Sequence, residues 1–176
     1  YRLTGRFVDS VGSQVGYLPF DYKRQAWAGR FDWKWSALAA RREQMPDLAP
    51  VGSLLGGLTA EAATALGLPE GLPVVAAAAD KACEIVGAGA AAPEIGAISY
   101  GTTATIAVTT PRYFEPTPWI PPYPALLPGH YNTEVQIFRG YWMVNWFKQQ
   151  FGHHEQHQGA ALGVAPEALF DALVNS

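Results

Sequence analysis

The sequence contains a single cysteine, Cys83, so no disulfide can form within the chain. One thiol is compatible with a reducing compartment, and we expect a cytoplasmic protein. A long apolar run is also lacking, because the longest one, Leu72 to Ala79, is far shorter than the ~20 residues that a membrane-spanning helix needs. The opening residues, YRLTGRFVDS, have no apolar stretch of the kind found in a signal peptide. These absences predict a soluble protein that does not associate with membranes.

A large excess of charge of one sign is absent too. The sequence has 12 Lys and Arg residues against 15 Asp and Glu residues, a net charge of -3. The sequence also shows no stripe of basic residues, so we expect no nucleic-acid partner. At 49% hydrophobic residues and 176 residues in all, the chain can bury a core and suits one domain or parts of two. It begins at Tyr1 rather than Met and ends inside a helical pattern, from which we expect a fragment of a longer polypeptide.

The first half of the chain alternates short elements with loops rich in glycine and aromatic residues. Thr59 stands where an N-cap belongs and Gly67 where a C-cap belongs, so the residues between them are expected to form a short helix. The other elements expected in this half are a helix end over 1–8, a loop with short helical and extended pieces over 9–34, a helix over 33–44 stopped by Pro46, and an apolar strand over 53–58.

The second half begins after the turn-forming stretch LPEGLP, which predicts a domain boundary between residues 70 and 71. The expected elements are a buried strand over 73–78, a helix over 80–88, a hairpin of strands over 95–100 and 103–109, a proline-rich loop over 111–129, a strand over 130–138, a helix over 141–151, a polar loop over 152–164 and a helix from Pro166 onward. This order indicates an α/β domain with a mixed sheet.

Asp80 stands at the junction between the apolar run PVVAAAA and a helix. Ligands of open α/β sheets bind beyond the carboxyl ends of strands, so a carboxylate there meets ligand on one side and packed alanine and valine on the other. This placement suits a general base. Read alone, the same residue also fits a simple N-cap, which is the commoner use of Asp at a helix start.

The turn Gly101-Thr102-Thr103 joins two apolar strands. Glycine lets a ligand approach the backbone closely, and the threonines place hydroxyl donors beside backbone N–H groups. A phosphate needs several such donors at once. An ordinary β-turn would have the same composition, so the turn by itself does not distinguish the two interpretations.

The two features follow each other in one order. The segment LPVVAAAADKACEIVGAGAAAPEIGAISYGTTATI resembles the start of the second domain of the FGGY carbohydrate kinases. Its Asp80, Gly87-Ala88-Gly89 and Gly101-Thr102-Thr103 match that family's invariant Asp, its G-A-G and its G-T-S or G-T-T turn. Further matches are YRLTG at residues 1–5, YLPFD at 17–21, LAPVG at 48–52 and GGLT at 56–59. The resemblance therefore covers nearly the whole chain.

The resemblance implies an actin-like, ribonuclease H-like ATPase fold. Residues 1–70 would be the end of the first, sugar-binding domain, and residues 71–176 the first part of the second, nucleotide-binding domain. It implies ATP-dependent phosphorylation of a sugar or polyol with Mg²⁺, Asp80 as the base that takes the proton of the attacking hydroxyl, and Gly101, Thr102 and Thr103 as contacts of the ATP phosphates. We expect Lys81, beside Asp80, to contact substrate or phosphate, although a solvated lysine is the plainer alternative.

The chain also departs from the family pattern. It contains no D-x-G-T phosphate loop, and Tyr141 and Trp142 are bulky where relatives have small residues. These departures leave an alternative open, a non-catalytic module of the actin fold that binds a nucleotide or a partner. The resemblance also implies that the fragment alone has no kinase activity.

Two groups of residues stay outside this interpretation. His153, His154 and His157 could bind zinc if they lay on a helix, but their glycine-flanked segment predicts a loop and no metal site. Aromatic residues near the start, Trp27 to Trp35, are expected to buttress the first domain. Trp119 is expected to plug its loop against the sheet, and a contact with a second subunit in a homodimer is the open alternative.

Overall fold

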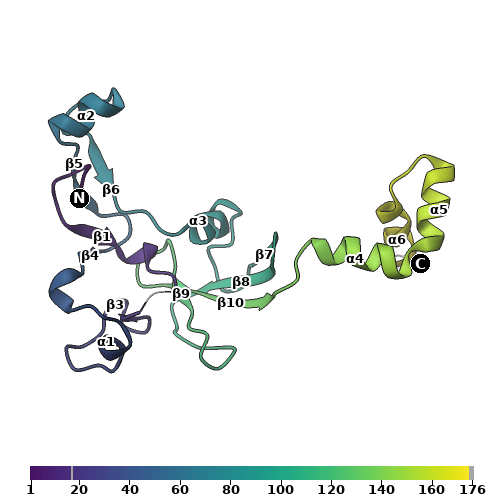
Figure 1. The fold of residues 1–176 in the computed structure, drawn as a ribbon, viewed down its shortest axis with the longest axis horizontal. Helices are drawn as coiled ribbons and strands as arrows, with labels where there is room; N and C mark the ends of the chain where they lie inside the picture. Colours follow the sequence, from purple (N-terminus) through teal and green to yellow (C-terminus); the bar gives the residue numbers. More distant parts are fainter. Residues whose placement is uncertain (17, 175–176) are drawn as a thin grey trace. The chain divides into compact units, whose positions relative to one another are not determined.

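The computed structural model describes residues 1–16 and 18–174. Residues 1–97 and 106–135 form one compact unit, and residues 98–105 and those from 136 onward form a second. The first contains β1 (Val8–Ser10), η1 (Val11–Ser13), β2 (Phe20–Asp21), β3 (Ala26–Trp27), α1 (Lys34–Ala37), η2 (Arg42–Gln44), β4 (Asp47–Ala49), β5 (Leu54–Gly57), α2 (Ala60–Leu66), β6 (Pro73–Val75), α3 (Asp80–Gly87) and β9 (Tyr123–Pro124) (Figure 1). The second contains α4 (Trp142–Phe151), α5 (His153–Leu162) and α6 (Pro166–Val174). β7 (Gly96–Tyr100), β8 (Ala104–Thr110) and β10 (Tyr131–Ile137) run from one unit into the other.

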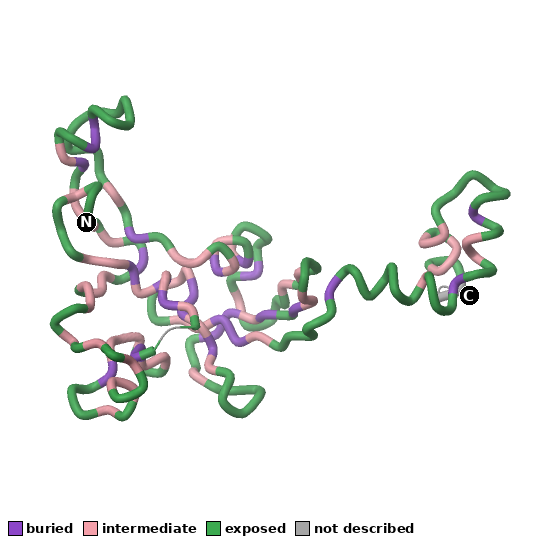
Figure 2. The backbone as a smooth tube through the Cα atoms, viewed as in Figure 1, coloured by how far each residue is buried: buried purple, intermediate pink, exposed green. Residues whose placement is uncertain are grey.

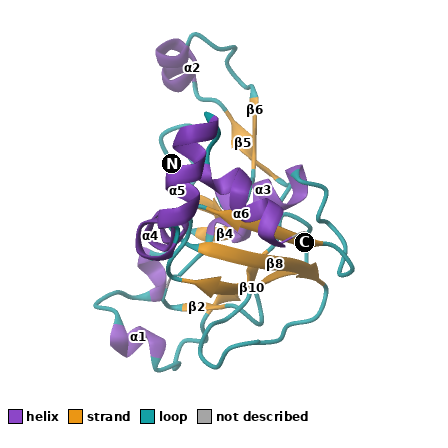
Figure 3. Cartoon of the chain, turned by 90° about the vertical axis from the view of Figure 1, so that its right-hand side faces the viewer, coloured by secondary structure: helices purple, strands orange, loops and turns teal. Residues whose placement is uncertain are grey.

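The β5–β6 ribbon carries α2 at its end (Figures 1 and 3). Thr59 caps α2, because its side chain accepts a hydrogen bond from the N–H of Ala62, and Gly67 ends the helix in the left-handed conformation at φ 67°. Leu58, Ala62 and Ala63 form a small core to which Val74 of β6 adds. The helix and both of its predicted caps are confirmed.

A sheet of order β7-β8-β10-β9 forms the centre of the second half. The predicted hairpin and the strand over 130–138 are confirmed, and the proline-rich loop contributes β9, which pairs antiparallel with β10. Helix α3 packs on this sheet through Ile85, which is 2% exposed and clusters with Ala90 and with Ala107 of β8. This contact holds α3 against the sheet.

Helices α4, α5 and α6 follow one another in the second unit. Aromatic rings join α4 to α6, because the ring centroid of Phe147 lies 5.6 Å from that of Phe170. Within α4, the ring centroids of Trp146 and Phe151 lie 5.7 Å apart. Figure 2 shows α4 exposed along nearly its whole length. Among the described residues, the aromatic side chains of α4 therefore do not form a buried core.

The predicted loop over 152–164 is wrong, because most of it forms α5. Its glycines, which suggested a loop, are packing and capping residues. A Cβ on Gly159 would lie 2.8 Å from the carbonyl oxygen of Val164, and one on Gly152 would lie 2.5 Å from the ring of Phe170. Gly163 caps the helix in the left-handed conformation at φ 69°.

Two other predicted elements differ from the structure. The helix over 33–44 is interrupted, since Leu38 is extended and Trp35 turns back to donate a hydrogen bond to the carbonyl of Gly29 at 2.9 Å. The strand over 73–78 is shorter and not buried, because β6 pairs only with β5 in a ribbon and Val75 is 54% exposed.

The aromatic residues of the first unit do not form one cluster. Trp27 donates a hydrogen bond to the carbonyl of Pro46 at 2.7 Å and so buttresses its surroundings as expected. Phe31 and Trp33, in contrast, are 95% and 66% exposed. Trp119 is 94% exposed, so the expectation that it plugs its loop is wrong.

Tyr17, Asn175 and Ser176, which fall in predicted segments, lie outside the described residues. Over residues 1–16 and 18–174, none of the helices is long and apolar enough to cross a membrane.

The two threonines of α2 allow a matched test of its cap. Replacing Thr59 by Ala removes the bond to the Ala62 N–H, so the free energy of unfolding should fall by about 1 kcal/mol. Thr64→Ala is the control: its exposed hydroxyl bonds back to the Ala60 carbonyl, and alanine favours a helix more than threonine does. Urea denaturation of the full-length protein measures both. An equal loss in the two variants would contradict the cap.

The ion pair between α4 and α6 makes a prediction about pH. Lys148 Nζ lies 2.6 Å from Glu167 Oε1, and this hydrogen bond, aided by a backbone hydrogen bond, holds the pKa of Glu167 below its ordinary 4.5. A lowered pKa stabilises the folded state above pH 4.5, and that stabilisation is lost as the pH falls through the folded pKa. The protection factor of the α6 amides, which removes the intrinsic pH dependence of hydrogen exchange, should therefore fall in acid in the wild type. In Glu167→Gln the protection factor should already be lowered at neutral pH and change little on acidification.

Candidate active site

Asp80 is the first residue of α3 and not its cap. Ala79 occupies the N-cap position and makes no side-chain capping bond. The carboxylate of Asp80 instead accepts a hydrogen bond through Oδ1 from the N–H of Lys81 at 2.7 Å. The N-cap interpretation is therefore wrong, although the positive end of the helix still favours a negative charge at this position.

The Asp80 residue is exposed, so the partial burial expected for it is not found in this chain. The cause lies in β6, which ends at Val75 and does not continue as a buried strand up to the helix. Residues 76–79 instead form an extended linker between β6 and α3. Asp80 at the end of this linker is open to a ligand.

The linker is held by backbone hydrogen bonds on both sides. On one side, the N–H of Gly52 donates to the carbonyl of Ala76 at 2.8 Å, and the N–H of Ala76 donates to the carbonyl of Ser53 at 2.8 Å. On the other side, the N–H of Ala79 donates to the carbonyl of Gly12 in η1 at 2.9 Å. The start of α3 is therefore fixed by segments that lie far away in the sequence.

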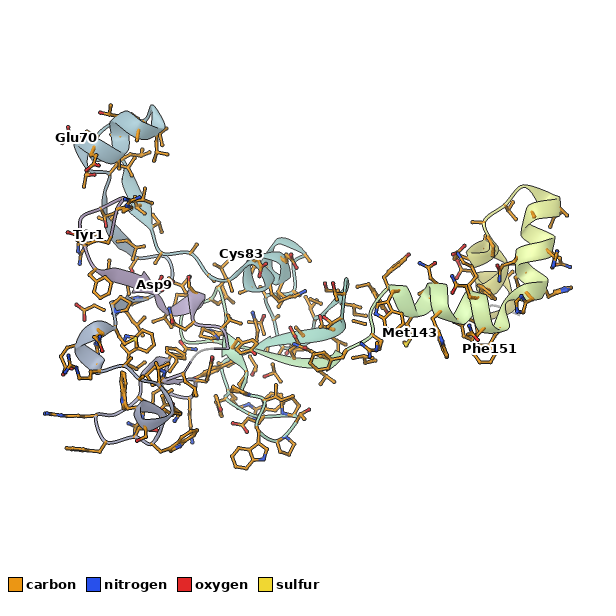
Figure 4. All side chains as sticks on the ribbon, viewed as in Figure 1. Tyr1, Asp9, Glu70, Cys83, Met143 and Phe151 are labelled. Atoms are coloured by element: carbon orange, nitrogen blue, oxygen red, sulfur yellow. The ribbon has the colours of Figure 1, made fainter. Side chains whose placement is uncertain are left out.

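Cys83, labelled in Figure 4, lies one turn after Asp80 on α3. Its thiol is free and donates to the carbonyl of Ala78 at 3.6 Å, which ties the first turn of the helix back to the linker. Lys81 also lies in this turn, and its Nζ is 3.4 Å from Glu84 Oε2. The side chains of this pair are 35% and 63% exposed, so the ion pair itself is worth little.

The turn Gly101-Thr102-Thr103 lies in the second unit. The N–H of Gly101 donates to the carbonyl of Thr103 at 2.9 Å, so this N–H is not the free donor that the sequence suggested. Among the described residues, the hydroxyls of Thr102 and Thr103 have no hydrogen-bond partner. Two hydroxyl donors are thus available at the turn.

Gly140, just before α4, holds this turn in place. Its N–H donates to the carbonyl of Thr102 at 2.9 Å, and the N–H of Tyr141 donates to the carbonyl of Gly101 at 2.9 Å. A Cβ on Gly140 would lie 2.0 Å from the Gly101 oxygen, so no larger residue fits without moving the turn. The bulky side chain of Tyr141 is 64% exposed and does not disturb this contact.

The structure thus brings Asp80 and Lys81 together in the first unit and the three turn residues together in the second. No local pattern pointed to Gly12 and Gly140, which support these two parts, or to Ser10, whose hydroxyl donates a hydrogen bond to the Ala77 carbonyl of the linker. Their contacts join residues far apart in the sequence, and glycines and serines are too common to stand out. The run of alanines before Asp80 was the available signal, because it allows another backbone to approach closely.

The three histidines lie on a helix and not in the loop that was expected for them. His153, His154 and His157 lie on α5, which is the helix that a zinc interpretation needed. Nevertheless, within the described part of the chain no group of three or more His, Cys, Asp or Glu side chains is placed to hold a metal ion.

Comparison with models of protein families finds no match. The sequence is 31% identical to the uncharacterized sugar kinase YgcE of Escherichia coli (strain K12) over 97% of this chain and 35% of that protein. It is 26% identical to the xylulose kinase of Lactococcus lactis over 85% of this chain and 29% of that protein. The chain therefore spans about a third of the length of the curated relatives that it matches.

Solved structures agree with these relatives. The crystal structure of xylulose kinase from Rhodospirillum rubrum covers 99% of this chain with a TM-score of 0.77, at 24% identity and over 34% of that protein. This likeness identifies the fold as the actin-like ATPase fold, of which the chain forms a part. Over the span that it shares with these proteins, the chain is similar to carbohydrate kinases, which supports the resemblance to a part of an FGGY carbohydrate kinase.

Proposed function

We propose that the full-length protein phosphorylates a hydroxyl group of a sugar or polyol with ATP, and that Asp80 is the general base. The observation that carries this proposal is the similarity to sugar kinases over 97% of the chain, together with an exposed Asp80 at the start of α3. The relative's name specifies a sugar kinase but no particular sugar.

The chemistry requires one proton transfer and one phosphoryl transfer. Asp80 takes the proton of the substrate hydroxyl, whose oxygen forms a bond to the γ-phosphorus of ATP. The bond between that phosphorus and the bridging oxygen breaks, and ADP leaves with the electron pair. A base in this role must lie within hydrogen-bond reach of the hydroxyl, which an exposed carboxylate at a helix start allows. Most of the remaining acceleration comes from positioning and electrostatic stabilisation.

The turn at residues 101–103 is our candidate for the contact with the ATP phosphates. Phosphate oxygens accept several hydrogen bonds, and the exposed Thr102 and the half-buried Thr103 offer hydroxyl donors at this turn. Lys81 is a candidate contact for substrate or phosphate, because it places a positive charge directly beside Asp80.

Mg²⁺ would neutralise charge on the ATP phosphates. Among the described residues, no cluster of carboxylates or histidines is built to hold a metal ion, so we assign no metal ligand in this chain. Mg²⁺ keeps most of its contacts to water and to substrate phosphates, and it would arrive with ATP.

We further propose that residues 1–70 end a sugar-binding domain and that residues 71–176 begin a nucleotide-binding domain, with the substrate between them. We also propose a cytoplasmic location, which the single cysteine supports. The exposed Trp119 is a candidate contact for a homodimer.

Asp80→Asn in the full-length protein tests the proposed base. Loss of a general base should lower sugar-dependent ADP release by at least about 100-fold, while the protein stays folded because the side chain is exposed. Glu94→Gln, the same chemical change at another exposed carboxylate, should leave turnover unchanged. Wild-type turnover in Asp80→Asn would contradict the assignment. Nucleotide binding without turnover on any sugar or polyol would favour a non-catalytic module instead.

Gly140→Ala tests the proposed phosphate contact. The added Cβ collides with the Gly101 carbonyl, so the turn must move and the KM for ATP should rise about tenfold, with less effect on the KM for the sugar. Gly87→Ala adds the same methyl group where nothing lies within 4 Å and serves as the control. A rise in the sugar KM alone would show that the turn serves the sugar and not the nucleotide.

A further inference from the structure

The linker that ends at Asp80 rests on η1, a short turn nearly 70 residues earlier in the chain. We propose that Ser10 and Gly12 are positioning residues that hold this linker, and so hold Asp80 where it can accept the substrate proton. The inference rests on the proposed function, because it gives these residues a task in the reaction through Asp80.

Ser10 ties η1 to the linker through its side chain. The residue is 2% exposed, and its hydroxyl donates its single proton to the carbonyl of Ala77. The same oxygen accepts a hydrogen bond from the N–H of Gly12 at 3.1 Å. The hydroxyl therefore bridges the turn and the linker, three residues before Asp80.

Neighbouring side chains fix the orientation of Ser10. Asp9, labelled in Figure 4, accepts a hydrogen bond from the N–H of Ser10 at 2.7 Å. Its other carboxylate oxygen accepts one from Gln14 Nε2 at 2.9 Å, and the same amide also donates to the carbonyl of Ser10 at 3.1 Å. Because Gln14 is 3% exposed, this network is shielded from water and keeps the turn in one shape.

Gly12 brings its backbone directly against the linker. Its carbonyl accepts the N–H of Ala79, the residue before Asp80, at 2.9 Å. A Cβ on Gly12 would lie 2.7 Å from Ala78 Cβ, 2.7 Å from Val51 Cγ2 and 2.9 Å from Ala78 Cα. The last contact is with backbone, which cannot rotate away, so any side chain at position 12 pushes the linker.

These contacts matter for Asp80 because its own side chain is exposed and is not packed in a pocket of this chain. The direction of the carboxylate is therefore set by the backbone from which it starts. The tethers act on Ala77 and Ala79, so they control that starting point. A displacement of about 1 Å at a reacting group can lower a rate by about 100-fold.

Kinetics of the full-length protein test the inference. Ser10→Ala should lower kcat about tenfold, the equivalent of one lost hydrogen bond, and Ser10→Thr should recover part of it because the hydroxyl remains. Gly12→Ala should lower kcat by about 100-fold. The KM values for sugar and ATP should change little, since neither residue is expected to touch a substrate.

Two matched controls separate this effect from a general one. Thr64→Ala removes a hydroxyl that bonds back within α2, and Gly29→Ala adds a methyl group where nothing lies within 4 Å. Both should keep the wild-type kcat. In the Asp80→Asn background, Ser10→Ala should lower the residual rate no further, because its effect passes through the Asp80 carboxylate. An equal further loss in that background would overturn the inference and leave Ser10 a merely structural role.

Hydrogen exchange supplies a readout that does not depend on activity. Ser10→Ala and Gly12→Ala should each raise exchange in the segment 76–83, where the Ala79 N–H is bonded to Gly12. The two controls should not. Unchanged exchange in Ser10→Ala would overturn the inference even if the protein is a kinase. A wild-type protein that turns over no sugar or polyol would instead overturn the proposed function, whatever the exchange shows.

Discussion

The close approach of η1 to the alanine linker is the constraint on which the arrangement of the first unit depends. Gly12 lies against Ala78 with no room for a Cβ, and the opposite side of the linker is bonded to Gly52 and Ser53. The linker is thus contacted by η1 and by the turn before β5, and it leads directly into α3. Small residues permit this contact, and backbone hydrogen bonds, which are costly to leave unmade, give it strength.

The second unit uses the same device at its own candidate site. Gly140 approaches the Gly101 carbonyl so closely that a Cβ would overlap it, and two backbone N–H groups bond the turn. In both places the residue with the proposed chemistry is exposed, and the residue that supports it is a glycine with no chemistry of its own. Each glycine supports its site because the lack of a side chain lets two backbone segments come close. The proposed chemistry depends instead on side chains that face solvent or ligand.

This division explains what could be predicted from the sequence. The α2 caps, the hairpin around residue 101 and helix α3 have local signals, because each is decided within a few residues of chain. The contact between Ser10 and Ala77 is decided by folding over long separations and leaves no local pattern. The prediction of a loop over 152–164 failed for a related reason. Gly159 is required by packing against Val164, although glycine inside a helix usually signals a break.

The same division bears on Asp80 itself. From sequence alone its position favoured a cap, a role in which the side chain would stabilise the helix. In the structure Ala79 is the cap residue, and Asp80 follows it with an exposed carboxylate that accepts one hydrogen bond from the next N–H. Because the linker is held by backbone from both sides, the fold does not require the Asp80 carboxylate to hold it. Asp80 is thus an acid that the fold does not need, at the end of a linker held from both sides, and the proposed reaction gives it a task that stability does not.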